Sequence, residues 1–194
     1  MKWVSGYPEN YKRGLPYISG LLILNDPETG IPLAVMDCVW ITAKRTGAAT
    51  AVAARYLARP DSETVGILGC GVQGRSNLEA LQVCFPLKRV MAYDVDAQVQ
   101  QRYVEEMSAQ FGLEVVPVRE PKQAVAGCDI VVTAGPILKT PHATIHRTRP
   151  TRLRHECGVG KVCRAGLALM TSPQRPRRFT VQIPLLPLLP MVAI

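Results

Sequence analysis

Short apolar runs typical of buried strands follow one another along this chain, separated by segments with the apolar spacing of a helix, and this order predicts an α/β protein. Residues 64–68 and 89–93 are short apolar runs with the length and composition of buried strands. Residues 75–85, which lie between them, carry apolar side chains at helical spacing, and Pro86 ends that pattern. We therefore expect a strand, a helix and a second strand in immediate succession.

The same alternation continues toward the carboxyl terminus. We expect a helix over residues 97–111, a strand over 114–118, a short helix over 120–126 and a fourth strand over 129–134. Parallel strands joined by helices form a doubly wound sheet, which binds its ligands beyond the carboxyl ends of the strands. The expected fold class is α/β, with a Rossmann-type doubly wound parallel sheet.

Residues 1–62 have a different pattern, which predicts a partial β-rich domain. Residues 17–25 and 31–37 are apolar runs on either side of the turn sequence D-P-E-T-G, so we expect a β-hairpin. An alanine-rich helix is expected over residues 42–58, with Arg45 in its first turn. A cation there opposes the helix dipole, which favours an anionic partner for Arg45.

The sequence G-C-G-V-Q-G directly follows the first strand of the α/β region and has G-x-G-x-x-G spacing. The first glycine of this motif permits a tight turn, the second lets the backbone approach a pyrophosphate, and the third lets helix and strand pack closely. The pyrophosphate binds to unpaired N–H groups at the helix start. The candidate cofactor-binding residues are Gly69, Gly71, Val72, Gln73 and Gly74.

Two further residues are candidates for contact with the same dinucleotide. Asp94 ends the second strand, 23 residues after Gly71, near the separation at which an acid binds the adenosine ribose. Its carboxylate would repel a 2′-phosphate, and the next cation is Arg102, so we expect NAD rather than NADP. Thr133, at the end of the fourth strand, could line the nicotinamide side. The alternatives are a glycine turn that binds nothing and an ordinary strand-to-loop transition at Thr133.

The composition of the chain argues against a membrane protein, a secreted protein, a disulfide-bonded protein and a metal-binding protein. No apolar run is long enough to span a membrane, and the start of the chain lacks a signal-peptide pattern, so we expect a cytoplasmic protein without a membrane partner. The six cysteines lack paired spacing and predict neither a disulfide framework nor a metal site. The formal net charge is +8, but residues 1–145 hold 14 Lys or Arg and 14 Asp or Glu. The excess lies in the tail.

The tail, residues 146–194, holds nine Lys or Arg and one acidic residue, and residues 183–190 repeat proline every third position. Such a segment forms neither a packed helix nor a central strand, so we expect it to be disordered or non-native. The expected domains are a partial substrate and dimerisation domain over residues 1–62, an incomplete Rossmann domain over residues 63–145, and this tail.

Several motifs, in the same order along the chain, resemble the ornithine cyclodeaminase/mu-crystallin family. The resemblance covers roughly residues 1–145 and is far more specific than a glycine-rich loop alone. The motifs are K-W-V-S-G-Y-P (2–8), D-P-E-T-G (26–30), M-D (36–37), T-A-K-R-T-G-A-A (42–49), Y-L-A-R-P-D-S (56–62) and G-C-G-V-Q-G (69–74).

The resemblance implies a homodimeric protein in which NAD oxidises or reduces the Cα–N bond of a small amino or imino acid, as in the conversion of ornithine to proline and ammonia. Lys2 and Arg45 match the family positions that bind the substrate carboxylate, and a guanidinium can bind both carboxylate oxygens in one plane. The family's catalytic aspartate and a further arginine have no recognisable counterpart. We therefore name no catalytic residue, and we expect a chain truncated at both ends.

Two alternatives to an enzyme remain open. The chain could be a catalytically silent dinucleotide-binding fragment or a crystallin-like protein, which would bind NAD without turnover. Nucleic-acid binding through the basic tail is disfavoured, because the tail has no interleaved aromatic residues and no recognised module.

Overall fold

The computed structural model describes residues 1–135, 168–169 and 179–182. The chain forms two compact units that divide within one helix, between Arg45 and Thr46. No helix among these described residues is long and apolar enough to cross a lipid bilayer.

The amino-terminal unit contains a three-stranded antiparallel sheet in the order β1-β2-β3. The predicted hairpin is confirmed as β2 and β3. Its turn is held by Asp26 Oδ1, which accepts hydrogen bonds from the N–H groups of Glu28 and Thr29 at 3.0 and 2.7 Å. The elements of the sheet and its connection are β1 (Lys2–Gly6), the 3-10 helix η1 (Pro8–Arg13), β2 (Ile18–Asn25) and β3 (Pro32–Asp37).

Helix α1 (Val39–Leu57) begins three residues earlier than we expected from the sequence. Asp37 Oδ1 accepts the N–H of Val39 at 2.8 Å, which satisfies one of the unpaired donors at the helix start. Arg45 therefore lies in the second turn, whereas the helix dipole acts mainly on the first. The expected conflict between Arg45 and the dipole was wrong, and it gives no support to an anionic partner.

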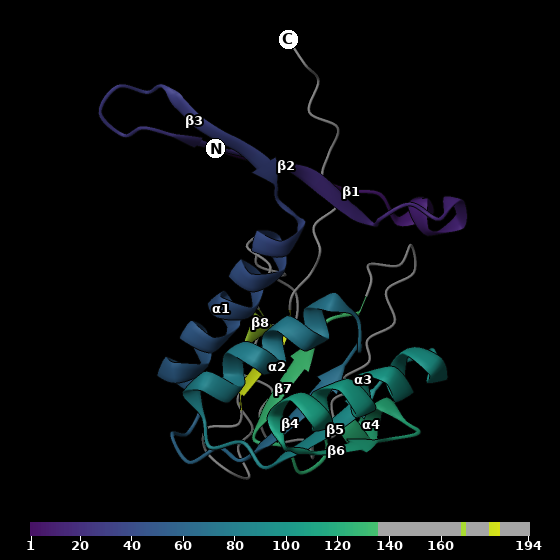
Figure 1. Cartoon of the computed structure of the whole chain (residues 1–194). Helices are drawn as coiled ribbons and strands as arrows, with labels where there is room; N and C mark the ends of the chain where they lie inside the picture. Colours follow the sequence, from purple (N-terminus) through teal and green to yellow (C-terminus); the bar gives the residue numbers. More distant parts are fainter. Residues whose placement is uncertain (136–167, 170–178, 183–194) are drawn as a thin grey trace, which may run out of the picture. The chain divides into compact units, whose positions relative to one another are not determined.

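The second unit contains a largely parallel sheet with helices on both faces, so the predicted fold class is confirmed (Figure 1). The strand order is β6-β5-β4-β7-β9-β8, and the first four strands are those that we expected. The elements are β4 (Thr64–Leu68), α2 (Val72–Cys84), β5 (Arg89–Tyr93), α3 (Ala97–Phe111), β6 (Glu114–Pro117), α4 (Pro121–Val125), β7 (Ile130–Thr133), β8 (Ala168–Leu169) and β9 (Phe179–Gln182).

Alternating side chains of the strands form two separate cores. Val65 and Ile67 of β4 belong to the larger core, which includes side chains of α1, α2 and α3. Leu68 belongs to the smaller core, together with Ala124 of α4. Gly66 allows α4 to approach β4, because a Cβ at this position would lie 1.7 Å from the Ala124 carbonyl oxygen.

Two short strands occur in the segment for which we expected no regular structure. Strand β9 pairs with β7 in parallel, and β8 pairs with β9 in antiparallel. This corrects the expectation for residues 168–169 and 179–182. The F-T-V-Q sequence of β9 has the composition of a strand, but the prolines and arginines around it hid that signal. The proline repeat of residues 183–190 lies outside the described residues.

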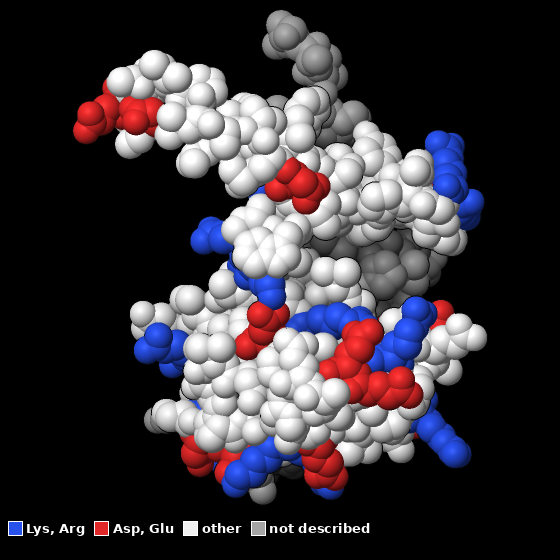
Figure 2. All heavy atoms as spheres, in the orientation of Figure 1, with Lys and Arg blue, Asp and Glu red and all other residues white. Residues whose placement is uncertain are grey.

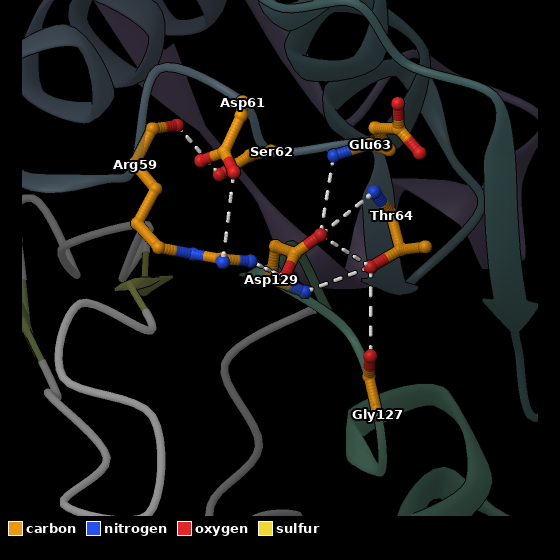
Figure 3. Close-up of polar contacts among 7 residues, drawn as sticks. All are labelled: Arg59, Asp61, Ser62, Glu63, Thr64, Gly127 and Asp129. Atoms are coloured by element: carbon orange, nitrogen blue, oxygen red, sulfur yellow. Dashed lines mark hydrogen bonds and ion pairs between the residues drawn. The ribbon is translucent and has the colours of Figure 1, made fainter.

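A buried carboxylate joins the amino ends of β4 and β7. Asp129 Oδ2 accepts hydrogen bonds from the N–H groups of Glu63 and Thr64 at 3.1 and 3.2 Å and from the Thr64 hydroxyl at 2.8 Å (Figure 3). Its Oδ1 atom forms an ion pair with Arg59. Burial would raise the pKa of Asp129, but these hydrogen bonds and the Arg59 charge lower it below its ordinary value.

Candidate functional site

The glycine-rich loop connects the carboxyl end of β4 to the start of α2. Gly69 has φ +103°, and a Cβ at this position would lie 2.7 Å from the carbonyl carbon of Ala134. Only glycine meets both conditions without strain. The helix begins at Val72 rather than at the expected Arg75. The last residues of the motif therefore form the first helical turn.

The other two glycines of the motif serve different purposes. Gly74 is buried, and a Cβ there would lie 2.3 Å from the Gly69 carbonyl oxygen and 3.3 Å from Ile67 of β4, so this glycine permits close packing of α2 on the loop and the strand. Among the residues that the structure describes, no atom lies within 4 Å of a Cβ placed at Gly71, and Gly71 gives α2 no side-chain cap. The start of α2 thus combines open space with backbone N–H groups, an arrangement that suits an anion such as a pyrophosphate.

Asp94 is fixed beside this loop at the carboxyl end of β5. Its Oδ2 atom accepts the N–H of Cys70 at 2.7 Å, and its Oδ1 atom accepts the N–H of Asp96 at 3.0 Å. A carboxylate oxygen has two lone pairs, so each can accept a further hydrogen bond.

The Cys70 thiol is buried, and burial together with the Asp94 charge raises its pKa to about 12. It is therefore protonated and unreactive at neutral pH.

Arg75 is a part of the site that the sequence analysis missed. Its guanidinium donates to the Cys70 carbonyl oxygen and, through Nε at 2.7 Å, to Glu106 of α3. It also lies 5.5 Å from the ring centroid of Tyr103. The Arg75 hydrogen bond lowers the pKa of Glu106. A signal was present, since Arg75 is a cation in the first turn of α2, the placement that we had noted only for Arg45.

Thr133 lies at the same edge of the sheet, at the end of β7. It pairs in register with Leu68, the last residue of β4. Its Oγ1 atom is buried and has no hydrogen-bond partner among the described residues. A buried hydroxyl without a partner is uncommon, so this atom could accept or donate a hydrogen bond to a ligand at the carboxyl edge.

Lys2 and Arg45 belong to the amino-terminal unit. Lys2 Nζ donates to the Thr42 hydroxyl at 3.2 Å, which brings β1 to the first turn of α1. Arg45 follows Thr42 by three residues and therefore lies on the same face of the helix. Both cations are exposed. The family resemblance implied both residues for one carboxylate, and the structure places both beside Thr42 of α1.

The chain has clear similarity to known proteins. A family model described as "Ornithine cyclodeaminase/mu-crystallin family" matches residues 1–147. The alanine dehydrogenase of Archaeoglobus fulgidus is 42% identical over 139 residues, which are 72% of this chain and 42% of that protein. The ornithine cyclodeaminase of Agrobacterium fabrum is 35% identical over 133 residues, which are 69% of this chain and 37% of that protein.

A solved structure shares the fold of the matched region. The Δ1-pyrroline-2-carboxylate reductase of Thermococcus litoralis, in complex with NADH and L-proline, is 44% identical, with a TM-score of 0.66. The match covers 68% of this chain and 41% of that chain. The present chain therefore spans about two fifths of the length of these relatives.

Proposed function

Because the chain belongs to the ornithine cyclodeaminase/mu-crystallin family, we propose that it functions in an NAD-dependent reaction at the Cα–N bond of a small amino or imino acid. The resemblance found in the sequence is confirmed by the family match. The observation that carries the proposal is the start of α2, where Gly71 leaves open space beside a helix end without a side-chain cap. When bound, NAD would accept a hydride from the substrate Cα, or NADH would return one.

In this proposal, different residues of the α/β unit bind the pyrophosphate, the adenosine ribose and the nicotinamide side of NAD. The loop from Gly69 to Gly74 binds the pyrophosphate through backbone N–H groups. Asp94 binds the adenosine ribose through the lone pairs that Cys70 and Asp96 leave available. The unpartnered hydroxyl of Thr133 orients the nicotinamide side.

Asp94 also supports a preference for NAD over NADP. Its carboxylate is held in place by the two backbone N–H groups described above, so it cannot easily turn away from a 2′-phosphate. Two like charges at contact distance repel each other. The next basic residue along the chain, Arg102, donates to the Gln98 carbonyl oxygen of its own helix at 3.3 Å.

We assign the substrate carboxylate to Lys2 and Arg45. Both are exposed cations on one side of α1, and a carboxylate can bind a guanidinium and an ammonium together. Thr42 supports this arrangement, because its hydroxyl accepts from Lys2 and donates to the Cys38 carbonyl oxygen at 2.6 Å. Turnover of ornithine, alanine or a cyclic imino acid in a substrate screen would identify the substrate.

We also propose that the chain forms a homodimer through one face of its amino-terminal sheet. The strand register places Trp3 opposite Leu21, and Ile23 opposite Val35, on one face of this sheet. Trp3 and Val35 are 75% and 63% exposed, and most of the visible hairpin surface carries no charged side chain (Figure 2). Apolar patches of this kind mark contact surfaces. A Val35→Asp variant is expected to elute as a monomer when the parent elutes as a dimer, and a monomeric parent would contradict the proposal.

Calorimetric titration with NAD tests the proposed function. We expect the full chain to bind NAD and a Gly71→Glu variant to lose binding, because the new carboxylate occupies the open space at the start of α2. The matched control is Gln98→Glu, which adds the same charge to the exposed first turn of α3. Absence of binding by the parent chain, or equal loss in both variants, would contradict the proposal. Binding without turnover of any amino or imino acid would favour the catalytically silent alternative.

A further inference from the structure

We propose that Arg75 is a positioning residue that holds the glycine-rich loop in the conformation that receives the cofactor pyrophosphate. The inference rests on the proposed function, because it concerns how the chain prepares the same site. Arg75 would act through the Cys70 carbonyl group, with its own position set by Glu106 and Tyr103 of α3.

The peptide groups on both sides of Cys70 are fixed by side chains from different elements. The Cys70 N–H donates to Asp94 at the end of β5, and the Cys70 carbonyl oxygen accepts from Arg75 of α2. These two contacts set the direction of the chain as it enters Gly71. Gly71 has no side chain to fix its own conformation, and no atom of residues 1–135 lies within 4 Å of its Cβ position. Restraint of the loop must therefore come from its neighbours.

Fixing this loop before the cofactor arrives has a direct effect on affinity. Glycine has the greatest backbone freedom of all residues, so ordering a glycine-rich segment on binding is costly. A segment that already has its bound conformation avoids that cost. The contacts on Cys70 therefore affect affinity although neither Asp94 nor Arg75 needs to touch the pyrophosphate for this effect.

Helix α3 fixes Arg75 in turn. Glu106 accepts from Arg75 Nε at 2.7 Å, and the guanidinium lies over the ring of Tyr103. The Tyr103 hydroxyl donates to the Gly74 carbonyl oxygen at 3.4 Å, and Tyr103 is fully buried. Two residues of α3 therefore hold this region: Tyr103 contacts the first turn of α2, and Glu106 positions Arg75, which donates to the loop at Cys70.

The placement of Arg75 favours a role in the site over a role in helix stability. A cation in the first turn of a helix is destabilising by itself. Its charge does, however, add positive potential near the helix start, where an anion is expected. Arg89 offers a comparison, because it forms a similar two-point contact with Glu114 at the amino end of β5, away from the loop.

The test compares the NAD affinity of the full chain with that of three variants. We expect Arg75→Met, which keeps an unbranched apolar stem but removes the guanidinium, to raise the Kd for NAD about tenfold, as for loss of a charge-assisted hydrogen bond. Arg75→Lys should restore part of the affinity, because a lysine can keep the charge but cannot hold both acceptors in the same plane. The matched control, Arg89→Met, should change the Kd less than about twofold.

A second measurement separates positioning from general stability. Amide hydrogen exchange of the chain without NAD should accelerate in Arg75→Met at residues 70 and 75, whose N–H groups donate to Asp94 and to the Gly71 carbonyl oxygen, and remain unchanged in the β4 and β5 strands. Parent-like affinity in Arg75→Met, or uniform acceleration of exchange with an unchanged Kd, would overturn the inference. If Arg75→Met does not fold, Arg75→Lys decides by the same two measurements. A parent chain that does not bind NAD would instead contradict the proposed function.

Discussion

Replacement of Asp129 by asparagine is expected to destabilise the chain strongly. Asp129 is 6% exposed and accepts three hydrogen bonds on Oδ2, two from backbone N–H groups and one from the Thr64 hydroxyl. The side-chain amide of asparagine has one acceptor oxygen and presents an NH2 group to the remaining donors. Arg59 would also lose its buried partner and keep only the exposed Asp61, 3.8 Å away, among the described residues.

The magnitude follows from these contacts. Breaking a buried ion pair by changing one partner costs about 3–5 kcal/mol, and Asp129→Asn should lie near the lower limit because one acceptor remains. An exposed pair costs about 1 kcal/mol or less. Glu114→Gln is the matched control, because Glu114 and its partner Arg89 have side-chain exposures of 56% and 52%. Urea unfolding at pH 7, followed by circular dichroism, measures both changes.

The dependence on pH gives an independent check. The pKa of Asp129 is lowered in the folded chain, so its contribution to stability is fully present above the unfolded pKa, about 4. That contribution is lost as the pH falls through the lower, folded pKa. Asp129→Asn should therefore remove part of the acid sensitivity of the parent. A loss of stability no larger than in Glu114→Gln, or an unchanged pH profile, would refute the reasoning.

Three further outcomes are expected. Gly74→Ala should weaken NAD binding and lower the free energy of unfolding by about 1–3 kcal/mol, because its Cβ would lie 2.3 Å from the Gly69 carbonyl oxygen; calorimetry and urea unfolding measure the two effects. Asp94→Asn should improve NADP binding relative to NAD by roughly tenfold, as tested by competitive titration. A thiol reagent at pH 8 should label the partly exposed Cys84 before the buried Cys70, as followed by peptide mass mapping.

The sequence by itself determined the order of the elements in the α/β unit. Strands that are buried on both faces must be short apolar runs, and the helices between them must have one apolar face, so both can be recognised locally. The glycine motif could be recognised for the same reason, since the turn at Gly69 and the packing at Gly74 are requirements of single positions.

Tertiary structure decided the contacts between residues distant in the chain. Arg59 and Asp129 are 70 residues apart, and Arg75 and Glu106 are 31 apart. No local period predicts which charged residue finds which partner, because that depends on how the strands order in the sheet. The same reason applies to β9, whose four residues become a strand only because the edge of β7 is available for pairing.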